Sequence, residues 1–211
     1  MHAPIPDLTF RETMSGPLAL GESDPLVGAG RGRHTPLTFH ATISVDDIEA
    51  FIRDPAHAAR LVAHISYAPI GDYLPVKRGS FNLFKAGDEP DTRLMTYGMA
   101  FEHQGREYYL SGTKTIRDDE EGDLWRDTTR LYCSLHEGSS ERGPVIGAGV
   151  LKMGLGNLLR LVSSMRSGRE GLAGVQAVAL FGRYFLGTLW DVYVPLARER
   201  ESEELDAVTA H

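Results

Sequence analysis

Short segments in which apolar and polar residues alternate constrain the fold of this chain more than any other feature. A period of two predicts strands that bury one face. Residues typical of turns separate neighbouring segments, as at 103–105 and 118–122. Short turns favour antiparallel pairing of the strands that they join. The expected strands span residues 8–16, 37–45, 61–67, 76–84, 93–102, 106–116, 124–136 and 145–153.

The even spacing of these segments predicts how the strands assemble. A long meander exposes two sheet edges unless the sheet curves and closes on itself. We therefore expect a mainly β fold, in which the antiparallel meander closes into a lipocalin-like (calycin-type) β-barrel. A barrel of about eight strands can enclose one small ligand.

Helix signals interrupt the strand pattern after the second strand. Ser44 is a candidate N-cap, because Asp46, Asp47 and Glu49 follow it and negative charge stabilises the first turn of a helix. This helix is expected to end near Arg53, before a proline. A second short helix is expected over residues 55–61. Residues 17–36 are rich in Gly and Pro and predict a mobile connection.

Apolar residues at helical spacing predict two C-terminal helices, over residues 157–165 and 175–194. The stretch 171–196 has the length of a membrane span, but it contains Gln176, Arg183 and Asp191. Charges near the middle of a span are costly. The prediction is therefore a buried helix, or a helix that lies over the mouth of a pocket, and no membrane span.

Composition narrows the classes of partner and compartment. The 211 residues carry a net charge of −7, which argues against nucleic acid as a partner, because phosphate binding needs a clustered positive surface. Cys133 is the single cysteine and cannot form an internal disulfide. No signal peptide is expected at the N-terminus. We expect one cytoplasmic domain over residues 1–196 and a charged, disordered tail over 197–211.

Three charged residues fall on the apolar faces of predicted strands. They are Glu12, Lys114 and Asp127, and alternation directs all three toward one interior. A buried charge is stable only when it is paired or bonded to a ligand. Two alternatives follow: a structural ion pair within the sheet, or the polar end of a pocket in which these residues act as acid and base.

Aromatic residues at strand spacing are candidates for the pocket wall. The predicted ligand-binding residues are Phe84, Tyr97, Phe101, Tyr108 and Trp125. The eight histidines show no metal-ligand spacing, and no nucleophile elbow is present. We therefore predict neither a metal site nor a cofactor.

Several motifs together resemble one known family. They are FRETMSG at residues 10–16, GSFNLF at 79–84, LSGTK at 110–114, DLWRDTT at 123–129, and LWDVY at 189–193 after Phe185. In this order they resemble an accessory domain appended to bacterial flavoproteins of the GMC oxidoreductase (cholesterol-oxidase-like) group. The resemblance spans about residues 8–193. It implies association with lipid-like or sterol-like substrates, but it carries over no flavin site, because no GxGxxG turn is present.

Three functions remain open from the sequence. The leading prediction is an accessory protein that binds a lipid-, sterol- or polyketide-like molecule inside the barrel. The alternative is a cofactor-independent isomerase or cyclase that uses the buried acid and base. A third is an interaction module that docks on a partner enzyme or a second copy through the 175–194 helix. The first two predict a cavity, and the third predicts a filled interior with an exposed apolar helix face.

Overall fold

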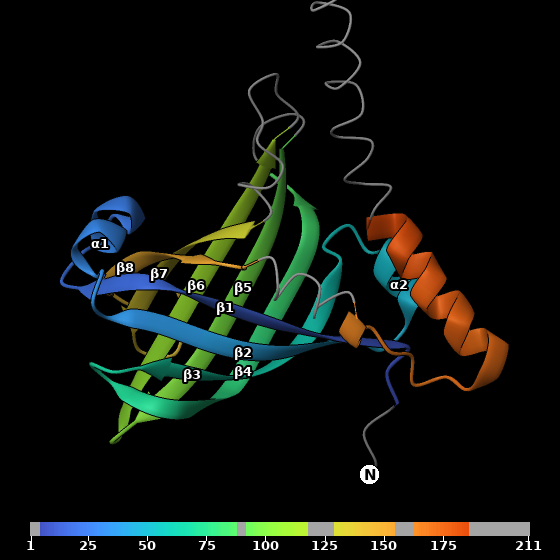
Figure 1. Ribbon diagram of the computed structural model, residues 1–211, viewed down its shortest axis with the longest axis horizontal. Coiled ribbons are helices and arrows are strands. Elements are labelled where there is room, and N and C mark those ends of the chain that lie inside the picture. The colour runs from blue at the N-terminus through green and yellow to red at the C-terminus, as the bar shows by residue number, and fades with distance from the viewer. Residues whose placement is uncertain (1–4, 88–91, 118–128, 155–162, 186–211) are drawn as a thin grey trace, which may run out of the picture.

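In the computed structural model, the chain forms a closed antiparallel β-barrel flanked by helices (Figure 1). The structure describes residues 5–87, 92–117, 129–154 and 163–185. Within these ranges, eight strands pair in sequence order and the last pairs with the first. The strands are β1 (Leu8–Leu20), β2 (Pro36–Val45), β3 (Ala58–Tyr67), β4 (Gly71–Ala86), β5 (Thr92–His103), β6 (Arg106–Arg117), β7 (Arg130–Glu137) and β8 (Val145–Lys152). The predicted fold class is confirmed.

Alternation decides which side chains enter the barrel. The odd-numbered residues of β2 after Pro36 are all buried: Leu37, Phe39, Ala41, Ile43 and Val45. The same period in β1 places Phe10, Glu12 and Met14 inside. A charged residue therefore faces the interior simply because it occupies an inward position.

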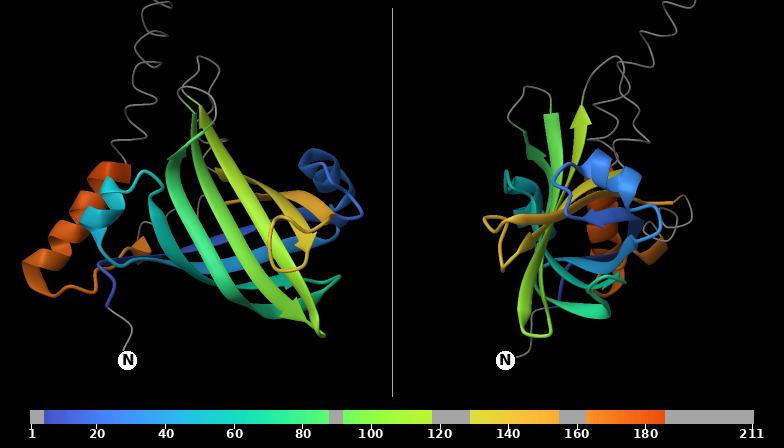
Figure 2. Two further views of the ribbon diagram at one scale, coloured as in Figure 1. Left: turned by 180° about the vertical axis from the view of Figure 1, so that it is seen from behind. Right: turned by 90° about the vertical axis from the view of Figure 1, so that its left-hand side faces the viewer.

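The strand register defines two ends of the barrel. At one end β1 begins, with Leu8 paired to Val45, and the C-terminal helix (residues 171–185) packs there beside α2 (Ile48–Arg53), as Figure 1 shows. The rings of Phe51 and Phe181 lie 6.2 Å apart in this contact. We call this the helix-covered end. The far end is the one at which β5 turns into β6 (Figure 2).

The helix predicted after the second strand is present, but its cap differs. β2 continues through Val45, so Asp47 rather than Ser44 caps α2. Asp47 Oδ1 accepts a hydrogen bond from the backbone N–H of Ala50 at 2.8 Å, and this bond lowers the pKa of the Asp47 carboxyl. The prediction of a short helix over residues 55–61 is wrong. A turn closed by Asp54, which accepts from the Ala56 N–H, leads directly into β3.

The prediction of a mobile connection over residues 17–36 is also wrong. β1 continues to Leu20, and α1 (Pro25–Arg31) follows, capped by Asp24 Oδ1, which accepts from two backbone N–H groups at 2.8 and 2.9 Å. Pro25 at the first helical position is pre-organised for this start. Gly28 lets α1 approach β8, since a Cβ there would lie 2.0 Å from the Ala148 carbonyl oxygen.

Irregular pairing explains why β4 is longer than predicted. It begins at Gly71 instead of residue 76, and its register shifts near His64 on one side and Asn82 on the other. Such bulges break the period of two that alternation relies on. β7 is described from Arg130, so the predicted strand residues 124–128 lie outside the described ranges.

The C-terminal predictions are covered only in part. The helix predicted over 157–165 lies mostly outside the described residues. The longer helix begins at residue 171 instead of 175, and its predicted continuation beyond 185 lies outside them too, as does the predicted tail at 197–211. Among the described helices, none is long and apolar enough to cross a membrane.

Candidate functional site

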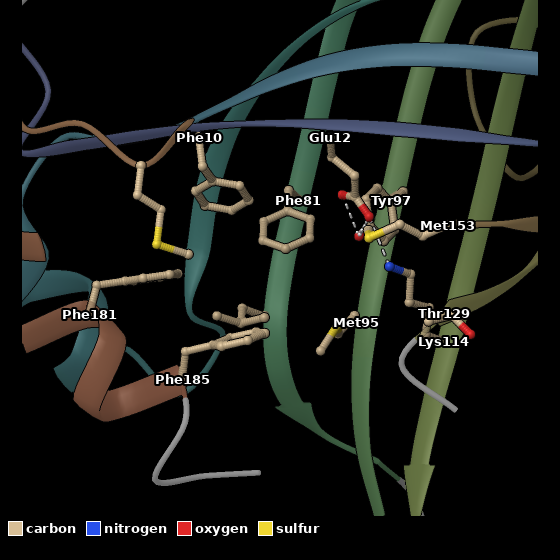
Figure 3. Close-up of a pocket in the computed structure, with 12 residues that line it drawn as sticks. Phe10, Glu12, Phe81, Met95, Tyr97, Lys114, Thr129, Met153, Phe181 and Phe185 are labelled. Atoms are coloured by element: carbon tan, nitrogen blue, oxygen red, sulfur yellow. Dashed lines mark hydrogen bonds and ion pairs between the residues drawn. The ribbon is translucent and has the colours of Figure 1, made fainter. Parts of the chain in front are cut away.

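A small cavity lies inside the barrel near its helix-covered end (Figure 3). Its volume is about 40 Å³, which is room for roughly two or three water molecules. The lining residues come from β1, β4, β5, β6, the start and end of the β7–β8 pair, and the C-terminal segment: Phe10, Glu12, Phe81, Leu83, Met95, Tyr97, Lys114, Thr129, Met153, Met165, Phe181 and Phe185. Most of this wall is apolar.

A hydrogen-bonded cluster of Glu12, Tyr97 and Lys114 forms the main polar part of the wall. Lys114 Nζ donates to Glu12 Oε1 at 2.9 Å. The Tyr97 hydroxyl donates to the same carboxylate, 2.8 Å from Oε2 and 3.1 Å from Oε1. Lys114 Nζ also lies 5.2 Å from the centroid of the Tyr97 ring, within range of a cation–π contact. Dashed lines in Figure 3 mark these contacts.

The cluster spans the interior of the barrel. Glu12 comes from β1, whereas Tyr97 and Lys114 come from β5 and β6, and β1 pairs only with β2 and β8 among the described strands. The contacts therefore run across the interior rather than along a strand pair. Inward-facing positions on each strand place all three side chains there. The ion pair thus links opposite walls of the barrel at the depth of the cavity.

Burial makes the pairing of these groups obligatory. The side chains of Glu12 and Lys114 are each 2% exposed. An isolated ion at such a position is costly, whereas a paired and hydrogen-bonded one is tolerated. Burial, and after it the negative charge of Glu12, holds the pKa of Tyr97 well above its ordinary value. Tyr97 therefore stays protonated and remains a hydrogen-bond donor.

Cys133 faces the same interior but has no features of a nucleophile. It is fully buried, and burial raises the pKa of its thiol far above the ordinary value, although the charge of Lys114 acts in the opposite direction. Its sulfur contacts the Leu131 carbonyl at 3.7 Å. A thiol held protonated is a weak nucleophile. Cys133 therefore behaves as a small buried apolar residue.

The C-terminal helix closes the cavity on the side away from the polar cluster. Phe181 packs 5.6 Å from the ring of Phe10 and stacks on Phe185 at 6.0 Å. Phe185 in turn stacks on Phe84 at 5.6 Å. Figure 3 shows Phe181 and Phe185 at one side of the cavity and Glu12, Tyr97 and Lys114 at the other. The helix therefore covers the mouth of the pocket, one of the two placements that the sequence predicts.

An anchor holds the segment before this helix to β1. Arg169 donates from Nε and from its terminal nitrogen to the two oxygens of Asp7, and Asp7 Oδ2 also accepts from the Ile48 N–H at 3.0 Å. Asp7 is 4% exposed. Nearby, Thr9 and Arg166 exchange backbone hydrogen bonds of 2.8 and 2.9 Å. The helix is thus fixed at its beginning by polar contacts and along its length by aromatic packing.

The predicted site residues fall into four groups. Glu12, Lys114 and Tyr97 meet in the cavity wall. Phe84 stacks on Phe185 and is not among the lining residues. Phe101 and Tyr108 stack on each other at 5.4 Å toward the far end of the barrel and do not line the cavity. Trp125 and Asp127 lie outside the described residues. The ion pair and the pocket wall, posed as alternatives, occur together, and the roles of these residues stay predictions.

Some lining residues were not predicted. Phe10, Phe81 and Met95 occupy inward strand positions, so alternation could have identified them. Met165 and Phe181 reach the cavity from the C-terminal segment, and no local pattern tells which part of a barrel a distant helix will cover. Across the described ranges, no group of three His, Cys, Asp or Glu side chains is placed to hold a metal ion.

Comparisons with known proteins add no identity to this geometry. No protein-family model, no curated protein and no solved structure matched the chain. The resemblance to the flavoprotein-associated domain therefore stays a prediction, as do the cytoplasmic location and docking through the C-terminal helix. The barrel fold itself is compatible with binding of a ligand.

Proposed function

We propose that the barrel binds a small, mostly apolar molecule that carries one polar group. The observation behind this proposal is the cavity, in which apolar walls surround the hydrogen-bonded cluster of Glu12, Tyr97 and Lys114. Small-molecule sites combine a largely apolar lining with a few fixed polar groups in this way. The apolar body of the ligand would contact Phe10 and Phe181, and its polar group would bind at the cluster.

Ligand binding requires the cavity to widen. Its volume of about 40 Å³ is far below the roughly 300 Å³ or more of ordinary ligand pockets. Phe181, Phe185 and Met165 belong to the segment that covers the barrel, so movement of that segment would enlarge the space without opening the sheet. Methionine side chains also adapt readily to the shape of a ligand. The proposal therefore includes an outward shift of the C-terminal helix on binding.

The chemical class of ligand is part of the proposal. A lipid-, sterol- or polyketide-like molecule would suit an apolar lining that carries a single polar cluster. The resemblance to a domain attached to cholesterol-oxidase-like flavoproteins supports the same class. In that setting the barrel would act as an accessory protein that holds such a molecule.

Native mass spectrometry of the full chain tests this proposal. We expect either a co-purified small molecule, identified after solvent extraction, or complexes with added 1-decanol or cinnamyl alcohol. Met95→Phe should fill the cavity and weaken binding, whereas Met99→Leu, on the same face of β5 but outside the lining, should leave binding unchanged. A folded wild-type chain that retains no apolar molecule would contradict the proposal.

A catalytic alternative is favoured by the hydrogen bonds that Glu12 accepts from two side chains beside the cavity. Glu12 borders the cavity and lies within hydrogen-bond reach of both Tyr97 and Lys114, so it could accept a proton from the ligand while one of these donors returns a proton to it. Isomerisation or cyclisation of the ligand would need only such transfers. Fresh protein incubated with the extracted ligand separates the functions. Conversion by the wild type but not by Glu12→Gln would indicate an enzyme, and recovery of unchanged ligand a binding protein.

A further inference from the structure

We propose that Lys114 binds its ligand covalently, as an imine with the carbonyl carbon of an apolar aldehyde. This inference rests on the proposed binding function and names the ligand class more closely. The ligand would be a molecule with an unsaturated or aromatic body and a terminal aldehyde. Three observations support it: the burial of Lys114, its position in the cavity wall, and the carboxylate beside it.

Lys114 differs from every other lysine of the chain. The sequence contains four lysines, at positions 77, 85, 114 and 152. Lys77 pairs with Glu102 on the surface, and Lys85 and Lys152 are exposed. Lys114 alone is buried, and its amine lies where an apolar molecule in the cavity would meet it. Enclosure in an apolar site is a common property of lysines that form imines.

Glu12 can remove the proton that keeps the Lys114 amine from reacting. Imine formation requires a lone pair on nitrogen, and Glu12 Oε1, 2.9 Å from Lys114 Nζ, can take the ammonium proton directly. Tyr97, which donates to the same carboxylate at 2.8 Å, can hold the carboxyl in place while the proton moves. No other group needs to enter the barrel for this transfer.

The bond changes balance without any redox partner. The nitrogen lone pair of Lys114 adds to the carbonyl carbon, and the carbonyl π electrons move to oxygen, which takes the proton held by Glu12. The resulting carbinolamine then takes up a second proton, the one released by nitrogen, at its hydroxyl and loses water as the C–O bond breaks. The net change converts an ammonium and an aldehyde into a protonated imine and one water molecule.

The product preserves the electrostatics of the interior. A protonated imine carries the same single positive charge as the ammonium it replaces, so the buried Glu12 carboxylate keeps its cation. Removing that cation would leave an unpaired buried charge, which is strongly unfavourable. Acylation of Lys114 to a neutral amide would do so, whereas imine formation does not. The pair therefore favours carbonyl ligands over acylating ones.

The rest of the lining selects the body of the aldehyde. Beyond the cluster, the lining that the structure describes is built from four phenylalanines, three methionines and a leucine, with Thr129 as the further polar member. Aromatic and sulfur-containing walls contact a planar or unsaturated chain favourably. From Lys114, such a chain would extend toward Phe181 and Phe185 (Figure 3). A ligand with a second charge would find no partner there.

Reductive trapping tests the inference. The full chain is incubated with cinnamaldehyde and sodium cyanoborohydride, and the intact mass is followed by peptide mapping. We expect one adduct, heavier by the aldehyde less one oxygen atom, at Lys114. It should form about tenfold or more faster than adducts at the surface lysines or the amino terminus, because the cavity holds the aldehyde beside the amine. Lys114→Arg, which keeps the charge, should lose this adduct, whereas Lys85→Arg should keep it.

Absorbance gives a second readout that does not depend on a variant folding. The protonated imine of cinnamaldehyde absorbs at longer wavelength than the free aldehyde, so wild-type protein should show a new band before reduction. Glu12→Gln should diminish this band, because it removes the counter-ion of the iminium. Adducts spread evenly over the surface lysines would overturn the inference. Binding of cinnamyl alcohol without any Lys114 adduct would overturn it while leaving the proposed binding function intact. Failure of both molecules to bind would overturn both.

Discussion

The two ends of the barrel are built from the same alternating strands but differ in what fills them. At the far end, apolar side chains such as Leu110 pack together, Phe101 stacks on Tyr108, and the hydroxyl of Tyr67 donates to the Leu18 carbonyl at 3.0 Å. At the helix-covered end, the ion pair of Glu12 and Lys114 lies beside a cavity. Under the proposed function, the far end contributes to stability and the helix-covered end holds the ligand.

Charged residues are a costly way to fill a core. A well-packed apolar replacement of a buried ion pair is often neutral or stabilising. The helix-covered end nevertheless holds its pair across the interior, between β1 and β6, under a helix that packs mainly through phenylalanines. The far end shows that the same barrel can be filled with apolar side chains. The comparison therefore supports the proposal that the ion pair has a role beyond holding the sheet together.

Breaking the ion pair should have the largest effect on stability. Lys114→Met leaves the Glu12 carboxylate buried without its cation, and we expect a loss of about 4 kcal/mol in the free energy of unfolding. Urea unfolding followed by circular dichroism measures it. The double variant Glu12→Gln with Lys114→Met should recover much of that loss, because it removes both charges. A double variant as unstable as the single one would contradict this view of the pair.

Truncating a side chain at the far end should lower the free energy of unfolding slightly less than breaking the ion pair, and it should not change ligand affinity. Leu110 is fully buried there, and Leu110→Ala should lower the free energy of unfolding by about 3 kcal/mol through lost burial and a new cavity. Affinity for cinnamyl alcohol, measured by calorimetry at a temperature where the variant is folded, should match the wild type. Reduced affinity would mean that the two ends do not act separately.

Releasing the anchor of the C-terminal helix should open the helix-covered end. Arg169→Ala leaves the buried Asp7 with fewer donors, at a cost of about 1 to 3 kcal/mol. Cys133 provides an internal reporter, because it is fully buried and its high thiol pKa makes it slow to react. We expect faster labelling of Cys133 by N-ethylmaleimide in the variant, under conditions where circular dichroism shows it folded. Arg166→Ala is the matched control, since Arg166 contacts β1 through its backbone.

Removing the Tyr97 hydroxyl should have the smallest effect on stability. Tyr97→Phe keeps the ring but loses the hydrogen bond to Glu12 at 2.8 Å, and we expect a loss of about 1 kcal/mol in the free energy of unfolding. Tyr108→Phe, in the stacked pair at the far end, serves as control for loss of a hydroxyl away from the cavity. The imine band of cinnamaldehyde should weaken in the first variant only. Equal bands in both would argue against a role for Tyr97.

Alternation predicts which face a residue occupies but not how deep it lies in the barrel. It therefore identified the barrel and the inward positions of Glu12 and Lys114, since a period of two fixes the face of each strand. It also grouped Tyr97 with Phe101, two inward residues on β5 that lie on different levels of the interior. Depth depends on strand stagger around the barrel, which is a property of the whole sheet.

Contacts between distant parts of the chain likewise could not be predicted from the sequence. The packing of Phe181 against Phe10 joins residues from the two ends of the described chain, and no local period encodes it. The anchor between Asp7 and Arg169 is of the same kind. The start of α1, by contrast, could have been predicted from the sequence, because Asp24 followed by Pro25 is a recognised signal for a helix N-terminus. The glycines around it favoured the prediction of a loop instead.

Methyl NMR of the methionines tests the division of the barrel most directly. Met95, Met153 and Met165 line the cavity, whereas Met99 is buried outside it. With methyl-labelled methionine in the full chain, titration with cinnamyl alcohol should shift the three cavity methyl signals in a saturable way and leave that of Met99 in place. Saturable shifts of Met99 with unmoved signals from Met95, Met153 and Met165, or no saturable shift at any of the four, would contradict a ligand pocket at the helix-covered end.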